Sequence, residues 1–192
     1  NSVSKELRTL MQSTPNVPGT STPEWKNVKF KTAQDGYRYG LVPTQYHKFA
    51  VTYHVAAGSF SKPGNYNLLW VADEDAYDGE RLVWPETQVY VVLRVTNNGE
   101  YYLTVNLGEK RHTRKLVDAP TRVELTLSDS SGSLEINLNR SKLVQWFLAL
   151  PLTDEPRGWW VGQPDTNLLG KRPHRNHPVN DLVVSYLPLP VP

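Results

Sequence analysis

Residues 110–115 (KRHTRK) place five potential cations within six positions of the sequence. If this segment is extended, successive side chains alternate between two faces, so Lys110, His112 and Arg114 share one face. A compact strip of cations of this kind binds a sulfate, a phosphate, a sialate or an acidic protein surface. The same pattern is typical of an edge strand whose charges keep it soluble and unpaired. Both interpretations stay open at this point.

Aromatic side chains with a polar group are the second candidates for ligand binding. The chain has six Trp and ten Tyr against four Phe, and Trp and Tyr occupy both half-buried positions and binding sites. Tyr37 and Tyr39 share a face if their segment is extended, so they form either a sugar-stacking platform or a cover over the core. Trp159 and Trp160 stand between glycines and point to opposite faces if they lie on a strand. We expect Trp159 at a rim, where it contributes to ligand binding.

The chain carries none of the sequence motifs that identify common enzymes. It has no cysteine, which excludes disulfides, thiol nucleophiles and Cys-ligated metals. Nucleophile elbows, phosphate-binding glycine loops and His-Glu-x-x-His are absent as well. Residues 73–80 (DEDAYDGE) hold five carboxylates, but Tyr77 and Gly79 break the EF-hand spacing, so a solvated acidic loop is favoured over a calcium site. We therefore expect no catalytic residue, no metal and no cofactor.

Length and charge limit the class of protein. The 192 residues fit one large domain. Lys and Arg number 21 and Asp and Glu number 19, for a net charge of +2. A protein with nucleic acid or an anionic membrane surface as its main partner usually carries a clear basic excess, so neither partner is expected. No apolar run approaches the roughly 20 residues that a membrane-spanning helix needs.

Two hairpins are predicted from alternating polarity. Residues 88–107 contain two β-rich runs on either side of Asn97-Asn98-Gly99, and Asn-Gly between such runs indicates a type I′ hairpin turn. Residues 121–127 (TRVELTL) and 133–138 (SLEINL) flank a DSSG turn and alternate strictly between apolar and polar positions. One face of this second hairpin is therefore dry and the other wet, as in a two-layer antiparallel sandwich.

The two glutamates on the wet face of the second hairpin are Glu124 and Glu135. They could face each other as a carboxylate pair of the kind that glycosidases use. Because Arg122 stands beside Glu124 in the sequence, a surface salt bridge is the simpler interpretation.

The remaining chain completes an all-β prediction. Further strands are expected over residues 28–31, 49–55, 66–72, 143–150 and 181–187, with about nine or ten strands in all. Residues 1–23 are predicted to form a short helix and a proline-rich linker, and residues 24–192 a single β-sandwich domain. The fold class is an antiparallel β-sandwich of jelly-roll or galectin/concanavalin-like type with a short N-terminal helix.

This architecture, with no enzyme motif, favours a non-enzymatic surface recognition domain. Cysteine-free sandwiches with proline-rich loops are typical of capsid protrusions of non-enveloped viruses, which bind a host glycan or protein receptor. We therefore expect a virion-surface or extracellular location and a possible homo-oligomer. The alternatives are a carbohydrate-active enzyme (a polysaccharide lyase or glycosidase on a concanavalin-like sandwich) and a lectin or carbohydrate-binding module.

Overall fold

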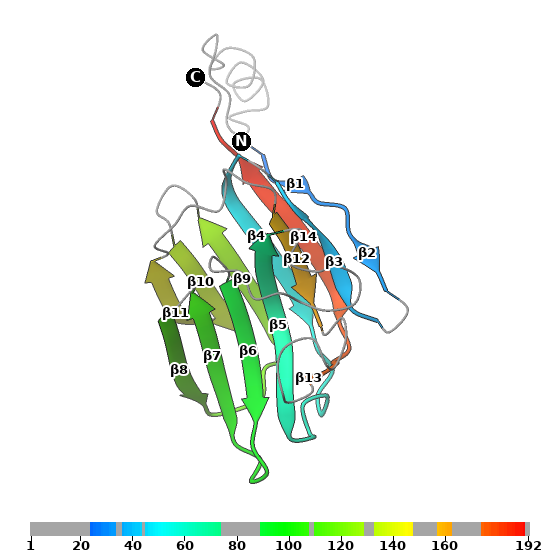
Figure 1. The fold of residues 1–192 in the computed structure, drawn as a ribbon, viewed down its shortest axis with the longest axis vertical. Coiled ribbons are helices and arrows are strands. Elements are labelled where there is room, and N and C mark those ends of the chain that lie inside the picture. Colours follow the sequence, from blue (N-terminus) through cyan, green and yellow to red (C-terminus); the bar gives the residue numbers. More distant parts are fainter. Residues whose placement is uncertain are drawn as a thin grey trace, which may run out of the picture.

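The computed structural model describes residues 24–33, 36–43, 45–73, 89–107, 110–128, 133–147, 157–162 and 174–190. In this part of the chain the regular secondary structure is entirely β, and the strands form two sheets (Figure 1). The all-β prediction is thereby confirmed for these residues. The predicted helix within residues 1–23 and all but the first residue of the acidic segment 73–80 lie outside them. No helix of the described chain is long and apolar enough to cross a membrane.

The two sheets differ in width. Sheet A has the order β1 (Lys26–Asn27), β14 (Asn180–Pro188), β4 (Tyr46–His54), β9 (Arg122–Ser128), β10 (Ser133–Leu138), β11 (Ser141–Phe147). Sheet B has the order β2 (Lys31–Thr32), β3 (Arg38–Val42), β12 (Arg157–Val161), β5 (Gly64–Asp73), β6 (Val89–Val95), β7 (Tyr101–Leu107), β8 (Lys110–Leu116), and β13 (His174–Arg175) adds to β5. All of these pairs are antiparallel except β13 with β5, which is parallel.

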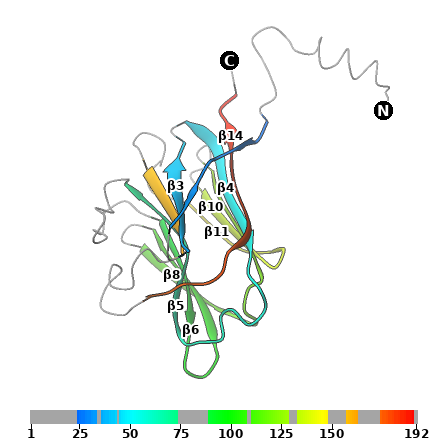
Figure 2. The same cartoon turned by 90° about the vertical axis from the view of Figure 1, so that its right-hand side faces the viewer.

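Figure 2 shows the two layers of strands from the side, and both layers contribute residues to one hydrophobic core. Sheet A contributes the apolar face of the second predicted hairpin, including Leu125 of β9 and Ile136 of β10. Sheet B contributes Val91 of β6 and Leu103 of β7 to the same cluster. Burial alternates along β9 as the sequence predicted, with every second residue in the core. The sheets therefore pack face to face.

The strand predicted over residues 28–31 is wrong. Residues 28–30 instead link two short edge strands, β1 on sheet A and β2 on sheet B, and Lys31 is the first residue of β2. The amide of Val28 donates to the carbonyl of Val184 (2.8 Å), and Val28 packs against the core. Phe30 contacts the ring of Trp159 edge-on at 6.1 Å. Val28 and Phe30 thus cover the side of the core between the two sheets and do not belong to one face of a single sheet.

The hairpin predicted around Gly99 is confirmed, but its turn type differs. β6 and β7 pair with Val95 opposite Tyr101. The amide of Gly99 donates to the carbonyl of Thr96 (3.0 Å), and Gly99 has φ +77° while neither Asn97 nor Asn98 has positive φ. This is a three-residue loop, in which a type I turn precedes a left-handed glycine, and not a type I′ turn.

Replacing Gly99 with valine is expected to lower the free energy of unfolding by about 1–2 kcal/mol, because a β-branched residue resists the left-handed region. A Cβ atom added here meets no atom of the described residues within 4 Å, so we attribute the cost to the backbone. Urea unfolding measures it, with Gly99→Asn as the control because asparagine tolerates this conformation. Equal stability of the valine variant and the native chain would show that Gly99 is not left-handed.

A tighter turn connects β10 and β11. Leu138 lies opposite Ser141, and the two residues between them, Asn139 and Arg140, have φ of 53° and 67°. Positive φ at both central positions defines a type I′ turn, in which glycine is favoured at the second. We therefore expect Arg140→Gly to raise stability by about 1 kcal/mol, since arginine bears a steric cost there that glycine does not.

The matched control for Arg140→Gly is Asn139→Gly. The Oδ1 atom of Asn139 accepts hydrogen bonds from the amides of Thr121 (2.8 Å) and Arg122 (3.1 Å). The control removes these bonds and is expected to destabilise. A thermal midpoint that falls for Arg140→Gly as well would mean that the arginine side chain itself stabilises the turn.

Candidate functional site

The cation-rich segment 110–115 forms β8, the last strand of sheet B. In its register with β7, Arg114 lies opposite Leu103 and His112 opposite Val105. Because Leu103 and Val105 are fully buried, Lys110, His112 and Arg114 lie on the inward side of the sheet, at its open edge. Inward-pointing charge on an edge strand opposes pairing with a second chain. The structure therefore favours the edge-strand interpretation of this segment.

The rim position predicted for Trp159 is wrong. Trp159 lies within β12, between β3 and β5, and its side chain is 0 % exposed. The physical reason is that β12 is an interior strand, so one of its two faces belongs to the core. Trp159 fills that core and presents no surface to a ligand.

Tyr37, Tyr39 and Trp160 pack on the outer face of sheet B. The rings of Trp160 and Trp70 lie 4.3 Å apart, and those of Tyr37 and Tyr39 lie 5.5 Å apart with a 38° tilt. Tyr37 is buried and Tyr39 half-buried within a second apolar cluster that also contains Tyr90. This packing favours the interpretation that the tyrosine pair covers apolar side chains, rather than the interpretation that it forms a sugar-stacking platform.

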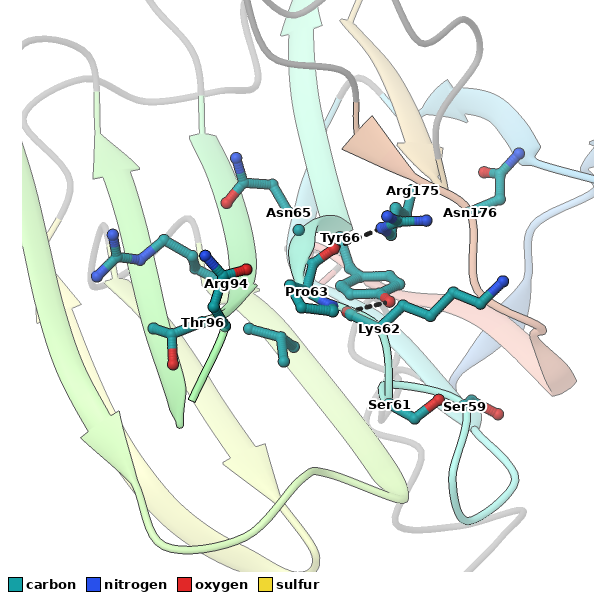
Figure 3. Close-up of a pocket in the computed structure, with 13 residues that line it drawn as sticks. Ser59, Ser61, Lys62, Pro63, Asn65, Tyr66, Arg94, Thr96, Arg175 and Asn176 are labelled. Carbon is teal, nitrogen blue, oxygen red and sulfur yellow. Dashed lines mark hydrogen bonds between the residues drawn. The ribbon is translucent and has the colours of Figure 1, made fainter. Parts of the chain in front are cut away.

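A cleft of about 880 Å³ lies elsewhere, where β5 begins and β6 ends (Figure 3). Three segments form its walls: residues 59–66, the end of β6 with its turn, and β13 with the residue that follows. Three of the lining side chains are cations: Lys62, Arg94 and Arg175. The others include the amides of Asn65, Asn97 and Asn176 and the hydroxyls of Ser59, Ser61 and Thr96. Figure 3 shows Arg94 on one side of the cleft and Lys62 and Arg175 on the other.

Backbone contacts position Arg175. Parallel pairing of β13 with β5 sets Arg175 opposite Tyr66, and its Nε donates to the carbonyl of Pro63 (2.5 Å). The side chain lies directly on Gly64, where a Cβ atom would come within 2.8 Å of that Nε. Glycine at position 64 therefore permits the close approach. The bond to Pro63 uses one of the five N–H donors of the guanidinium.

Tyr66 forms a rigid floor under these groups. Its side chain is buried, and its hydroxyl donates to the carbonyl of Lys62 (2.8 Å). Burial raises the pKa of Tyr66, so the hydroxyl stays protonated at neutral pH. Phe60 packs edge-on against the Tyr66 ring at 4.9 Å, and the buried ring of His177 lies 6.2 Å away. Lys62 and Arg175 thus lie beside a packed aromatic cluster.

The charge of the cleft is one-sided. Among the described residues that line it, three carry positive charge and none carries a carboxylate, although the whole chain has a net charge of only +2. A guanidinium binds carboxylate, sulfate or phosphate through two parallel hydrogen bonds. The neighbouring amides and hydroxyls both donate and accept, so they suit hydroxyl groups attached to the anion. The arrangement fits an anion that carries polar neutral substituents.

None of the predicted ligand-binding residues lines this cleft. The segment 170–178 (GKRPHRNHP) supplies Arg175 and Asn176, and its two prolines and lack of apolar periodicity indicate only a loop. Arg94 and Lys62 belong to unrelated segments and show no pattern. No group of metal-ligating side chains occurs in the part of the chain that the structure describes.

Comparison with known proteins shows similarity of fold without similarity of sequence. No protein-family model and no curated protein sequence matches the chain. The enzymatically active domain of tailspike protein 2 from bacteriophage CBA120 superposes with a TM-score of 0.50 at 10 % identity, over 88 % of this chain and 29 % of that one. The marine PL7 alginate lyase AlyA1 from Zobellia galactanivorans gives a TM-score of 0.50 at 12 % identity, over 84 % of this chain and 71 % of the lyase. The likeness shows the fold alone. The chain spans less than a third of the length of the tailspike structure.

Proposed function

We propose that this chain is a non-enzymatic recognition domain that binds an acidic glycan in the cationic cleft. The observation that carries the proposal is that Lys62, Arg94 and Arg175 line one cleft whose described lining has no carboxylate. The guanidinium of Arg94 lies over the ring of Tyr102, 5.1 Å from its centroid. The acid group of a sialate, a uronate or a sulfated sugar pairs with a guanidinium, and the sugar hydroxyls bond to the amides around it. The cleft volume of about 880 Å³ lies in the range of pockets that hold small ligands.

Two features of the cleft support binding without turnover. The Tyr66 hydroxyl is committed to the carbonyl of Lys62, and burial raises its pKa, so it is a poor general base at neutral pH. The described lining also offers no pair of carboxylates of the kind that most glycosidases use.

We further propose that the domain is a jelly-roll or galectin/concanavalin-like sandwich displayed on a larger particle, as a protrusion of a non-enveloped capsid. The chain crosses repeatedly between the sheets, from β3 to β4 to β5 and from β8 to β9, which supports this type of sandwich. A domain of similar fold forms part of the CBA120 tailspike, which supports display of such a fold on a virus. Mass spectrometry of purified particles from the source should detect peptides of residues 24–192. Their recovery only in a secreted fraction would favour a free lectin.

A glycan array with sialylated, uronate-containing, sulfated and neutral glycans tests the proposed ligand class, followed by calorimetry on the best binder. Arg94→Gln and Arg175→Gln are each expected to weaken binding of the acidic glycan roughly tenfold to a hundredfold, because each removes a charge-assisted hydrogen bond. Affinity should also fall as salt rises. Arg111→Gln is the matched control, since Arg111 is an exposed arginine of β8 outside the cleft.

Two further arms separate the alternatives. The double variant Lys110→Ser with Arg114→Ser tests whether the edge strand is the anion site. If this variant loses binding and the cleft variants do not, the anion site lies on β8. Incubation with acidic polysaccharides should release neither reducing ends nor unsaturated products. Turnover that the cleft variants abolish would mean that the cleft is catalytic, and binding that no cleft variant weakens would overturn the proposal.

A further inference from the structure

We propose that a groove on the outer face of sheet A is a second binding site, for a neutral sugar unit stacked on the indole of Trp25. The groove has a volume of about 290 Å³, at the lower limit for a small-ligand pocket. Its residues belong to sheet A and to the segment that enters β1, and none of them lines the cationic cleft on sheet B. The inference therefore stands whether or not the cleft binds an acidic glycan.

A row of short side chains forms the floor of this groove. Ser185 of β14 lies opposite Ala50 of β4, and Ala50 lies opposite Thr126 of β9. Their chain neighbours Phe49 and Leu127 are buried in the core, so the row itself faces outward. Three small residues on three adjacent strands leave a depression between the larger side chains around them. The floor is polar at both ends, where Ser185 and Thr126 carry hydroxyls.

Trp25 forms one wall. Its side chain lines the groove and is 49 % exposed, whereas Trp159 and Trp160 are 0 % and 4 % exposed. An indole face of this kind packs against the C–H face of a pyranose ring and removes apolar surface of both from water. A half-exposed tryptophan beside a polar floor suits a sugar ring, which has an apolar C–H face and polar hydroxyls.

Two carboxylates form the opposite wall and are held in place by their neighbours. Glu124 accepts a hydrogen bond from Nε of Arg122 (2.8 Å), which confirms the salt bridge expected from the sequence. Glu135, which lies opposite Thr126, accepts one from Nδ2 of Asn137 (3.1 Å). An ionised carboxylate has about four accepting positions, so Glu124 and Glu135 can each also accept from a sugar hydroxyl.

The charge of the groove selects against an acidic ligand. Among the described residues, two glutamates and one lysine, Lys48, line it, so the charge of this lining is opposite in sign to that of the cationic cleft. An anionic sugar would meet like charge near Glu124 and Glu135. A neutral hexose unit presents hydroxyl donors to the carboxylates and hydroxyl acceptors to Lys48, which matches the lining in both respects.

The test is saturation-transfer NMR on the full chain with the methyl glycosides of glucose, galactose, mannose and N-acetylglucosamine. At least one should receive saturation through its ring protons, and Trp25→Ala should weaken its binding at least tenfold. Trp25→Phe, which keeps an aromatic face, should retain more of the affinity. Ala50→Leu fills the floor without touching Trp25 and should also weaken binding at least tenfold.

Controls separate this site from the cleft. Arg175→Gln should leave binding of the neutral glycoside unchanged, and Trp25→Ala should leave binding of an acidic glycan in the cleft unchanged. The inference is overturned if none of the four glycosides binds, or if Trp25→Ala and Ala50→Leu bind as the native chain does. Hydrolysis of a neutral oligosaccharide that is lost in Glu124→Gln or Glu135→Gln would overturn it in favour of catalysis.

Discussion

Replacing Trp159 with alanine is expected to lower the free energy of unfolding by about 4 kcal/mol. The side chain is fully buried at the centre of β12, and Phe30 covers one edge of its ring at 6.1 Å. Truncation removes the largest type of side chain from a site flanked by two paired strands, which cannot collapse into the space left behind. The cost therefore combines lost burial with a large cavity.

Urea unfolding measures this loss, and Trp25→Ala is the matched control because it removes the same side chain from an exposed position. We expect the control to cost less than about 1 kcal/mol. At low temperature, where the Trp159→Ala protein still folds, its affinity for an acidic glycan should equal that of the native chain. Equal stability of the two alanine variants, or a selective loss of binding in Trp159→Ala, would restore Trp159 as a ligand-binding residue.

The strands that alternating polarity predicted are those with one wet and one dry face. β9 follows this rule residue by residue, and β10 follows it from Leu134 onward. In β5 the rule fails because a bulge between Asn67 and Leu69 puts both Leu68 and Leu69 into the core. A bulge changes which face each later residue occupies, and nothing in a run such as YNLLWVA marks its place.

Two interior strands were missed because their glycines indicate turns in a sequence. β3 and β12 contain Gly40 and Gly158, in the segments GYRYG and GWWVG. A Cβ atom at Gly158 would lie 2.6 Å from the ring of Trp160, and one at Gly40 would lie 3.0 Å from Nε1 of Trp159. These glycines make room for indole rings packed against the strands, a role that glycine also has within sheets.

The cationic cleft could not be predicted from local patterns. Arg94 comes beside Asn65 through the register of β5 and β6, and Arg175 comes beside Tyr66 through the parallel pairing of β13. Parallel pairs need long connections, and a strand of two residues has no period to detect. Each cation alone resembles an ordinary surface residue, so the site exists only after the register is known.

The buried histidine behind the cleft makes stability depend on pH. Nε2 of His177 lies 3.3 Å from the hydroxyl of Tyr53, and that hydroxyl donates its proton to the carbonyl of Leu68 (3.0 Å). This assigns the imidazole proton to Nε2 and leaves Nδ1 as a buried acceptor with no hydrogen-bond partner among the described residues. The rings of Tyr53, Phe60 and Tyr66 surround the imidazole. Burial among them lowers the pKa of His177 to about 3, because a charged ring would lose its hydration there.

Acidification from about pH 7.5 to about pH 5 is expected to cost about 2 kcal/mol of stability through His177 alone. The unfolded chain binds a proton at this histidine below its ordinary pKa of about 6.5, whereas the folded chain does so only below about 3. The contribution of His177 to stability is therefore complete above the pKa of the unfolded chain, and it is lost as pH falls from that pKa towards the pKa of the folded chain.

Urea unfolding at both pH values measures the loss in the native chain, in His177→Phe and in His177→Gln. Both variants lack the titrating group and should lose about 2 kcal/mol less than the native chain over this interval, whatever their own stability at neutral pH. His54→Gln, which removes an exposed histidine, controls for the loss of a surface imidazole. A native chain whose pH dependence matches that of both His177 variants would show that the ring is charged or hydrated in the folded state.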